Sequence, residues 1–397
     1  MLNGQDMSTG ECQVCHSTGV EAFVEIPRVP VFCNVLLETQ AEALHAPTGQ
    51  IRLGFCKNCG HIYNLSFGPQ WMSYSQAYEN SLHFSPRFQQ YAEGLARRLI
   101  DQYDLHEKHI IEIGCGKGEF LNLMCELGDN QGVGFDPSFE PDRAGLENAG
   151  RIKFIQDVYS SKYADYQADF LCSRHVLEHI QHPGEFLQEI RQSIGNERTV
   201  IYFEVPNVLY TLRDMGIWDL LYEHVSYFSS RSLAFLFTVN GFRVLNLSRA
   251  YLDQFLYIEA LPETKGKSAA ISIPGDAEEV EALVMAFANN YQKKVATWRA
   301  RMEQLADTQQ RVVVWGAGSK GVMFLNTLST QNRVGYAVDI NPLKQGRFIP
   351  GSGQKVVPPN FLRDYHPDVI ILMNPIYEEE VQRTVRNLGI APLFLKA

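Results

Sequence analysis

Apolar and polar positions alternate along this chain with two different periods, one typical of strands and one of helices. From His109 onward, short apolar segments alternate with segments of helical periodicity, a pattern typical of a doubly wound parallel sheet. A helix is expected at 85–103, where a Ser–Pro start signal opens a run of apolar residues at helical spacing. Strands are expected at 109–113, 131–135, 168–173, 199–204 and, late in the same unit, 253–261.

A second strand–turn–helix series begins at Arg311, after a break at 262–276 and one long helix at 276–308. Residues 1–65 are irregular and punctuated by cysteine, with short alternating runs that suit small strands. We therefore predict an α/β protein with four parts. They are an N-terminal domain at 1–75, a doubly wound domain at 76–262, a linker and long helix at 263–310, and a Rossmann-like domain at 311–397.

Net charge and hydropathy restrict the classes of partner that this chain is expected to bind. The formal net charge of −10, without any run of Lys and Arg, argues against nucleic acid, which requires a basic surface. No apolar stretch reaches the roughly 20 residues that span a bilayer, and the N-terminus lacks the features of a signal peptide. We expect a cytoplasmic protein with reduced thiols, no membrane contact and a small-molecule substrate.

Two Cys-x-x-Cys pairs lie near the N-terminus, Cys12 with Cys15 and Cys56 with Cys59. Each pair can present two thiolates from one tight turn, and two such turns complete a tetrahedral zinc site. Four thiolates leave no open position for a substrate, so the predicted zinc is structural. The alternative is four ordinary buried thiols. Cys33 lies between the pairs without a partner and is expected to pack as a small hydrophobe.

An apolar strand runs into a glycine-rich turn at 109–118, in the order His-Ile-Ile-Glu-Ile-Gly-Cys-Gly-Lys-Gly. Dinucleotide-binding domains use a similar turn, so the glycines alone leave an NAD domain open. Glu112 favours another cofactor. A carboxylate just before the glycines suits the ammonium of a bound amino acid and is unfavourable beside a pyrophosphate.

Acids close the following strands. Asp136 ends the next strand about twenty residues on, where an acid accepts hydrogen bonds from ribose hydroxyls. This order of strand ends resembles that of the class I methyltransferases. The resemblance implies an S-adenosylmethionine site in which Gly114 and Gly116 let the backbone approach the cofactor. It also implies that Asp136 holds the ribose, Asp157 the adenine amino group, and His175 the methionine end.

A dense block of acid, imidazole and phenols occupies 219–228, Asp-Leu-Leu-Tyr-Glu-His-Val-Ser-Tyr-Phe. The pair Glu223–His224 with phenols nearby suits removal of a proton beside a carbonyl and stabilisation of the resulting enolate, which methyl transfer to carbon requires. A second cluster at 74–80 follows the cysteine segment and can close over the same pocket. His179 is expected to cap or brace its own helix, and the alternative is a contact with the cofactor.

The C-terminal series carries Gly-Ala-Gly-Ser-Lys-Gly at 316–321 between a strand and a helix, a unit that can bind a nucleotide at the helix N-terminus. Gly321 supplies the third glycine of a dinucleotide motif, so the motif alone does not dismiss NAD. The unit is short, with three to four expected strands, and no substrate domain follows it. Both facts weigh against a dehydrogenase.

Together, the cysteine pairs, the class I core, the Glu-His-x-Ser-Tyr-Phe block and the C-terminal glycine unit resemble the sugar C-methyltransferases, which act on nucleotide-linked 4-keto sugars. The resemblance implies that His224 is the general base and that Glu223 orients it or steadies the substrate. Tyr78 would steady the enolate oxygen, and Tyr74 would contact the substrate. Lys320 and the turn amides would lie near the diphosphate. The alternative for this domain is packing alone.

One position departs from that family. Its members read Tyr-His-Glu-His where this chain reads Leu221-Tyr222-Glu223-His224. Tyr222 therefore remains a candidate catalytic phenol, or with His224 a hydrogen-bonded core pair. Three further readings stay open. They are C- or O-methylation of another enolisable or hydroxylated small molecule, an oxidoreductase using the C-terminal turn, and a zinc-bearing binding protein with an inactive cofactor fold.

Overall fold

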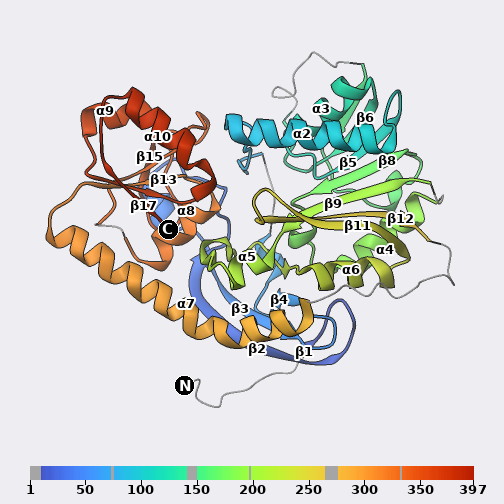
Figure 1. The fold of residues 1–397 in the computed structure, drawn as a ribbon, viewed down its shortest axis with the longest axis horizontal. Coiled ribbons are helices and arrows are strands. Elements are labelled where there is room, and N and C mark those ends of the chain that lie inside the picture. Colours follow the sequence, from blue (N-terminus) through green and yellow to red (C-terminus); the bar gives the residue numbers. More distant parts are fainter. Residues whose placement is uncertain (1–9, 73–75, 141–149, 196–197, 264–275, 331–332) are drawn as a thin grey trace.

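The described residues form three β-sheets, the helices that pack on them and one long helix that stands apart in length (Figure 1). The computed structural model describes residues 10–72, 76–140, 150–195, 198–263, 276–330 and 333–397. None of the helices within those ranges is long and apolar enough to cross a membrane.

The N-terminal sheet is antiparallel, in the order β1-β2-β3-β4-β10. Its last strand comes from much later in the chain, where Ser226 pairs with Tyr63. The segment after the Glu–His block is therefore a strand of the cysteine-bearing sheet. The short helix α1 (Gln40–Leu44) begins with a capping box between Thr39 and Glu42. The strands are β1 (Gly10–Glu11), β2 (Thr18–Pro30), β3 (Thr48–Cys56), β4 (Ile62–Asn64) and β10 (Ser226–Tyr227).

The central sheet has seven strands in the order β11-β12-β9-β8-β5-β6-β7. The strands are β5 (His109–Ile113), β6 (Gln131–Phe135), β7 (Ile152–Ile155), β8 (Phe170–Arg174), β9 (Val200–Pro206), β11 (Phe242–Ala250) and β12 (Phe255–Pro262). β5 to β9 run parallel, and β12 enters antiparallel beside β9. The strands expected from the periodicity are confirmed within two residues at their starts and ends. β11, which pairs with β12 as a hairpin, was not predicted.

Helices cover both faces of this sheet because neighbouring strand residues point to opposite sides. Ile110 packs with α2 and α3, whereas Ile111 packs with α4 and α6. The strand order changes direction between β5 and β8, and ligands of open α/β sheets bind outside the carboxyl ends of the strands at such a point. The helices of this unit are α2 (Pro86–Tyr103), α3 (Glu119–Gly128), α4 (Pro183–Ser193), α5 (Val208–Leu212) and α6 (Ser230–Val239).

The C-terminal sheet is parallel, in the order β15-β14-β13-β16-β17. The expectation of three to four strands was too low, because both edge strands are only three or four residues long and carry little periodic signal. The strands are β13 (Val312–Trp315), β14 (Tyr336–Val338), β15 (Lys355–Val357), β16 (Val369–Leu372) and β17 (Leu393–Lys396). The helices are α8 (Ser319–Thr327), α9 (Leu362–Tyr365) and α10 (Glu378–Asn387).

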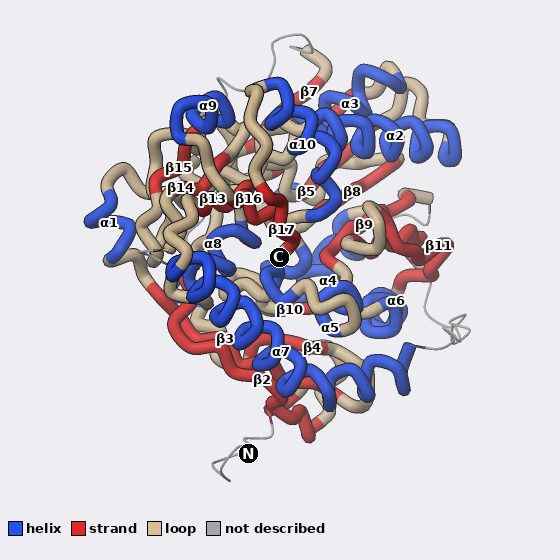
Figure 2. The backbone as a smooth tube through the Cα atoms, turned by 60° about the vertical axis from the view of Figure 1, so that its left-hand side comes forward, coloured by secondary structure: helices blue, strands red, loops and turns tan. Residues whose placement is uncertain are grey.

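The long helix α7 (Asp276–Asp307) links the N-terminal sheet to the C-terminal domain. Figure 2 shows it lying along β2 and β3. Its buried residues recur every three or four positions and form one apolar stripe. They belong to a single hydrophobic core that also contains residues of the N-terminal sheet and of the C-terminal sheet. The stripe consists of Val280, Val284, Phe287, Tyr291, Val295, Trp298, Met302 and Leu305.

We expect Phe287→Ala to lower the free energy of unfolding by about 3–5 kcal/mol, because the fully buried ring of Phe287 packs against Phe23 and Tyr291 and its removal leaves a cavity. Urea denaturation measures the loss. Met285→Ala on the same helix is the matched control, since Met285 is 77% exposed and its truncation should change stability by less than about 0.5 kcal/mol. Equal losses in both variants would contradict the role of α7 as part of the shared core.

Candidate active site

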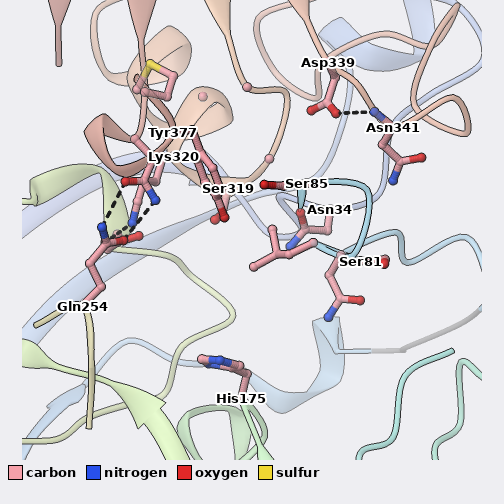
Figure 3. Close-up of a pocket in the computed structure, with 18 of the residues that line it drawn as sticks. Asn34, Ser81, Ser85, His175, Gln254, Ser319, Lys320, Asp339, Asn341 and Tyr377 are labelled. Carbon is pink, nitrogen blue, oxygen red and sulfur yellow. Dashed lines mark hydrogen bonds and ion pairs between the residues drawn. The ribbon is translucent and has the colours of Figure 1, made fainter. Parts of the chain in front are cut away.

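A cavity of about 300 Å³ lies between the central and C-terminal α/β domains and is closed by loop residues from the N-terminal part of the chain, Asn34 and those after Tyr78. Tyr78 and the residues after it form one wall, the carboxyl ends of β8 and β9 form the second, and the C-terminal domain forms the third. Figure 3 shows His175 on one side of this space, with Ser319 and Asp339 on the opposite side. Any molecule that fills the cavity contacts both α/β units.

The glycine turn after β5 has the geometry expected of a cofactor loop. Gly114, Gly116 and Gly118 have φ values of 71°, 56° and 88°, a region that residues with a side chain rarely adopt. A Cβ at Gly116 would meet no atom within 4 Å, so the backbone there borders open space. The turn therefore leaves room for a ligand that approaches the backbone closely.

Two aspartates lie just beyond the carboxyl ends of β6 and β7, the strands next to the glycine turn. One oxygen of Asp136 accepts from the Gly116 amide at 2.9 Å and the other from the Ser138 amide at 2.7 Å, so Asp136 braces the turn from the end of β6. Asp157, after the edge strand β7, accepts from the Tyr163 hydroxyl at 2.7 Å and pairs with Lys162, and these contacts lower its pKa to about 2. Asp157 therefore stays ionised.

Glu112 lies on β5 directly before the turn and is 3% exposed. Burial raises the pKa of its carboxyl group to about 8, and its Oε2 atom has no hydrogen-bond partner among the described residues. A buried polar atom without a partner is costly unless a ligand supplies one. The ammonium group of an amino-acid ligand fits this position, so Glu112, the open turn and Asp136 are consistent with S-adenosylmethionine.

His175 follows β8 in the left-handed region, with φ of 55°. Its Nε2 lies 3.2 Å from an oxygen of Glu204, and its Nδ1 lies 3.7 Å from Glu178. Burial opposes the protonated ring, yet the two carboxylates raise the pKa of His175 to about 9. Burial also disfavours the ionised form of Glu204, but Arg174 and His175 lower its pKa to about 2. The cavity therefore presents a cationic imidazole held by a buried carboxylate.

Glu223 is fully buried and connects three segments of the chain. Its carboxyl oxygens accept from the Cys33 amide at 3.1 Å and from the Tyr78 hydroxyl at 2.7 Å. Its backbone carbonyl is 2.9 Å from His179 Nδ1. Burial raises the pKa of Glu223, although His179 and the Tyr78 bond act in the opposite direction. The Tyr78 phenol thus reaches the cavity wall in a defined orientation.

His224 lines the cavity beside His179, with 4.9 Å between the ring centroids. Burial, followed by the charges of His179, His175 and Lys320, lowers the pKa of His224 well below 6.5. The imidazole is therefore neutral at physiological pH, and its Nδ1 has no hydrogen-bond partner among the described residues. A neutral imidazole in a cavity is a candidate general base. The carboxyl group of Glu223, which was expected to orient it, bonds to Cys33 and Tyr78 instead.

Contacts across the cavity join the central and C-terminal domains. Lys320 at the start of α8 pairs with Asp219, so this lysine already has an anionic partner. The side-chain amides of Gln254 and Asn374 donate to each other at 3.0 Å. Tyr251 donates its hydroxyl to that of Tyr377 at 2.8 Å, and Tyr251 opens a turn of three consecutive residues in the left-handed region. The hairpin β11–β12 is therefore fastened to the C-terminal domain at its tip.

The four N-terminal cysteines of the paired motifs converge. The sulfur of Cys12 lies 3.6 Å from that of Cys59, and Cys15 and Cys56 are separated by the same distance. All four sulfur atoms fall within 4.8 Å of one another. Tetrahedral zinc with Zn–S bonds of about 2.3 Å holds its sulfur ligands at such separations, so this donor set suits zinc.

Two family models match the chain in succession. Residues 84–247 match a methyltransferase domain, and residues 265–389 match a C-methyltransferase C-terminal domain. This chain is an S-adenosylmethionine-dependent methyltransferase. The second match assigns the Rossmann-like unit to the same type of enzyme, and both matches together support a C-methyltransferase.

A curated relative supports the same class. The methyltransferase is 24% identical over 287 residues to C-methyltransferase NovU of Streptomyces niveus, an alignment that covers 68% of this chain and 67% of the relative. Solved structures also match. One is a SAM-dependent methyltransferase from Aquifex aeolicus, with 11% identity, TM-score 0.32, and coverage of 42% of this chain and 89% of that one. Another is 1,6-didemethyltoxoflavin-N1-methyltransferase from Burkholderia thailandensis, with 14% identity, TM-score 0.36, and coverage of 52% and 97%.

The methyltransferase does not bring every expected residue to the cavity. Tyr222 is 2% exposed and lies outside the cavity lining. Its hydroxyl accepts from the Gly68 amide at 2.9 Å, and its ring packs on Phe67. Leu221, at the position that departs from the sugar C-methyltransferases, does line the cavity. Tyr74 lies outside the described residues.

Sequence reasoning missed Glu204, which organises the wall beside the cofactor turn. It accepts from the hydroxyls of Tyr91 and Tyr202 and pairs with Arg174 and His175. The available signal was a single acid at the carboxyl end of the otherwise apolar strand Val-Ile-Tyr-Phe-Glu-Val-Pro.

We expect cofactor binding at pH 7 to release a proton from Glu112. The raised pKa of about 8 keeps this carboxyl group protonated in the free methyltransferase, whereas an ammonium ligand favours the carboxylate. Calorimetric titration with S-adenosylmethionine in phosphate and in Tris measures the release, because the two buffers differ in ionisation enthalpy.

Glu112→Gln should abolish the buffer dependence and weaken affinity by about 10- to 100-fold. Glu126→Gln, at an exposed position of α3, is the matched control and should behave as the parent protein. Equal heats in both buffers for the parent protein would show that Glu112 does not ionise on binding.

Proposed function

We propose that this methyltransferase transfers a methyl group to a carbon atom of a nucleotide-linked keto-deoxysugar. The observation that carries the proposal is the shared cavity. His224 and Tyr78 form one side of it, and the glycine turn 316–321 of the C-terminal domain forms another. One side supplies acid–base groups, and the other supplies a helix N-terminus of the kind that binds phosphates. The resemblance to sugar C-methyltransferases and the similarity to NovU support the same class.

Carbon methylation requires a nucleophilic carbon. The bound S-adenosylmethionine would supply an electrophilic methyl group on a sulfonium, held by Glu112, Asp136 and the glycine turn. His224, neutral in its buried position, would remove the proton from the carbon beside the ketone. The negative charge that develops on the carbonyl oxygen then requires a donor nearby.

Tyr78 is the phenol placed to meet that charge. Its hydroxyl lies at the cavity wall, 2.7 Å from Glu223 Oε2 and 3.3 Å from the Asn34 side-chain amide. In the structure this hydroxyl donates its one proton to Glu223, so donation to the enolate oxygen would require a protonated Glu223 that donates to the phenol instead, a form that burial favours by raising the pKa of Glu223. The backbone carbonyl of Glu223 fixes His179 beside His224. Glu223 therefore acts by positioning both sides of the reacting carbon.

Leu221 supports a second candidate acceptor. Where sugar C-methyltransferases carry a tyrosine, this cavity is lined by an apolar side chain that cannot hydrogen-bond a sugar hydroxyl. An enolisable or hydroxylated molecule of lower polarity fits such a wall, with methylation on carbon or on oxygen. The position of the new methyl group in the product distinguishes the two chemistries.

The four converged cysteines would hold a structural zinc ion. The sheet they anchor contains β4, which pairs with β10 directly after the Glu–His block. His61, between the second cysteine pair and β4, is fully buried and stacks on Tyr63. Metal binding would therefore stabilise the strand that positions His224.

We expect incubation with S-adenosylmethionine and a nucleotide-linked 4-keto-6-deoxysugar to add one CH₂ to the sugar, detected by mass spectrometry and placed on carbon by NMR. His224→Ala should lower turnover by about 10²–10⁴-fold with cofactor affinity nearly unchanged. His106→Ala, at an exposed loop position, is the control and should retain activity.

The acid limb of kcat/KM should lie below pH 6.5. A general base must be deprotonated, and the lowered pKa of His224 keeps it so until the pH falls well beneath the usual histidine value. No mass gain together with intact cofactor binding would reject the keto-sugar acceptor. Loss of cofactor binding in His224→Ala would show that the residue is structural.

We expect the purified chain to contain one zinc ion, measured by elemental analysis, and Cys12→Ser to remove it and lower the melting temperature. Breaking a four-cysteine site removes binding free energy that contributes to folding. Cys125→Ala, at a buried cysteine of α3 outside the cluster, should retain the metal. Unchanged metal content in Cys12→Ser would refute the assignment.

A further inference from the structure

Three side chains able to ligate a metal ion meet on one wall of the cavity. Glu178, His179 and His224 all line it, and one ligand atom from each lies within 4.8 Å of the other two. The ligand atoms of one tetrahedral ion with bonds of about 2.1 Å lie about 3.4 Å apart. Small side-chain rotations therefore bring these three atoms to a single ion.

Two backbone contacts hold the segments of this cluster together. Glu178 and His179 follow each other in a short helical turn after β8. The Val225 amide donates to the Glu178 carbonyl at 2.7 Å. Nδ1 of His179 lies 2.9 Å from the Glu223 carbonyl. These contacts flank His224 in the chain, so the backbone places its imidazole against the turn.

Two of the three side chains carry a buried atom without a partner. Glu178 is 1% exposed, and its Oε2 accepts no hydrogen bond from the described residues. His224 is 8% exposed, and its Nδ1 has no partner in the part of the chain that the structure describes. Buried polar atoms in this state indicate a site for a ligand.

His179 has the orientation common among metal-bound histidines. Such a ring donates its second nitrogen to a carboxylate or a backbone carbonyl, and His179 makes this contact through Nδ1. A neutral ring in that form carries its lone pair on Nε2. The backbone thus selects the tautomer that a metal ion requires.

Two cations near the cluster already have anionic partners. Lys320 pairs with Asp219, and Nε2 of His175 lies 3.2 Å from Glu204. Nδ1 of His175 approaches Oε1 of Glu178 at 3.7 Å, which leaves Oε2 for an ion. The positive charge beside the cluster is therefore compensated before a metal ion enters.

We propose that Glu178, His179 and His224 bind one divalent transition-metal ion such as Zn²⁺, at a site separate from the four cysteines. Two imidazoles and a carboxylate suit zinc, iron or cobalt, whereas magnesium and calcium prefer oxygen ligands alone. Three protein ligands leave a coordination position open to the cavity.

The ion at this site inhibits methyl transfer. A neutral imidazole has one nitrogen lone pair, so His224 cannot accept a proton while it holds the ion. This consequence rests on the proposed role of His224 as the general base, whereas the site itself rests on the geometry of the cluster.

Titration of the full chain with Co²⁺, followed by visible absorption, tests the site. The parent protein should develop saturable d–d bands without the near-ultraviolet thiolate-to-cobalt band that a four-cysteine site produces. Glu178→Gln and His224→Ala should each weaken Co²⁺ binding by more than the roughly 10- to 100-fold that loss of an outer hydrogen-bond partner costs a metal site. Glu126→Gln and His106→Ala, at exposed positions, are the matched controls and should bind as the parent does.

All variants are compared at a temperature where their melting curves show them to be folded. Co²⁺ binding that is equal in the parent and in both cluster variants would overturn the proposal, as would a spectrum with thiolate bands alone. The titration needs no methyl acceptor, so it decides the site even where the proposed reaction fails.

Inhibition is measured as methyl transfer by the parent protein at increasing Zn²⁺. Turnover should fall as the site fills and recover on addition of EDTA, and Glu178→Gln should require correspondingly more Zn²⁺. His106→Ala should follow the inhibition curve of the parent. Cluster-dependent Co²⁺ binding without inhibition would retain the site, overturn the inhibition and reject His224 as the base.

Discussion

The architecture depends on the buried carboxyl group of Glu223. A polar group removed from water must find partners, and this one finds them in the Cys33 amide and the Tyr78 hydroxyl, both from the N-terminal part of the chain. Without the Cys33 amide of the N-terminal domain, one carboxyl oxygen of Glu223 would lose its partner. Strand β10 then carries the chain into the N-terminal sheet within three residues. The cysteine-bearing domain therefore supports one wall of the candidate active site.

One cavity contains two imidazoles in opposite protonation states. Near the cofactor turn, two carboxylates hold His175 as a cation with a pKa of about 9. His224 lies where burial and neighbouring positive charge keep its pKa well below 6.5. The surroundings of the two side chains shift their pKa values in opposite directions. His175 can therefore attract negative charge, while His224 can accept a proton.

The sequence was sufficient to predict features that depend on local signals. Strand β5 with its glycines, Asp136, the two cysteine pairs and the long helix α7 all follow from periodicity or spacing, and the structure contains each. Contacts between distant segments could not be predicted. In the block 219–228 the pattern did not show that Leu221 and His224 face the cavity while Tyr222 points into the core. The pairing of Lys320 with Asp219 joins residues 101 positions apart.

The turn at the tip of the β11–β12 hairpin shows how the parts of this enzyme are constrained to change together. Tyr251, Leu252 and Asp253 all occupy a backbone region that costs free energy. Tyr251 itself bonds to Tyr377, and Gln254, the next residue after the turn, bonds to Asn374. A different C-terminal unit, acquired by recombination to recognise a new carrier, would need an amide and a phenol at matching positions. Otherwise the strained turn would lose its support. New acceptor specificity is therefore more accessible through substitutions within the cavity than through exchange of whole domains.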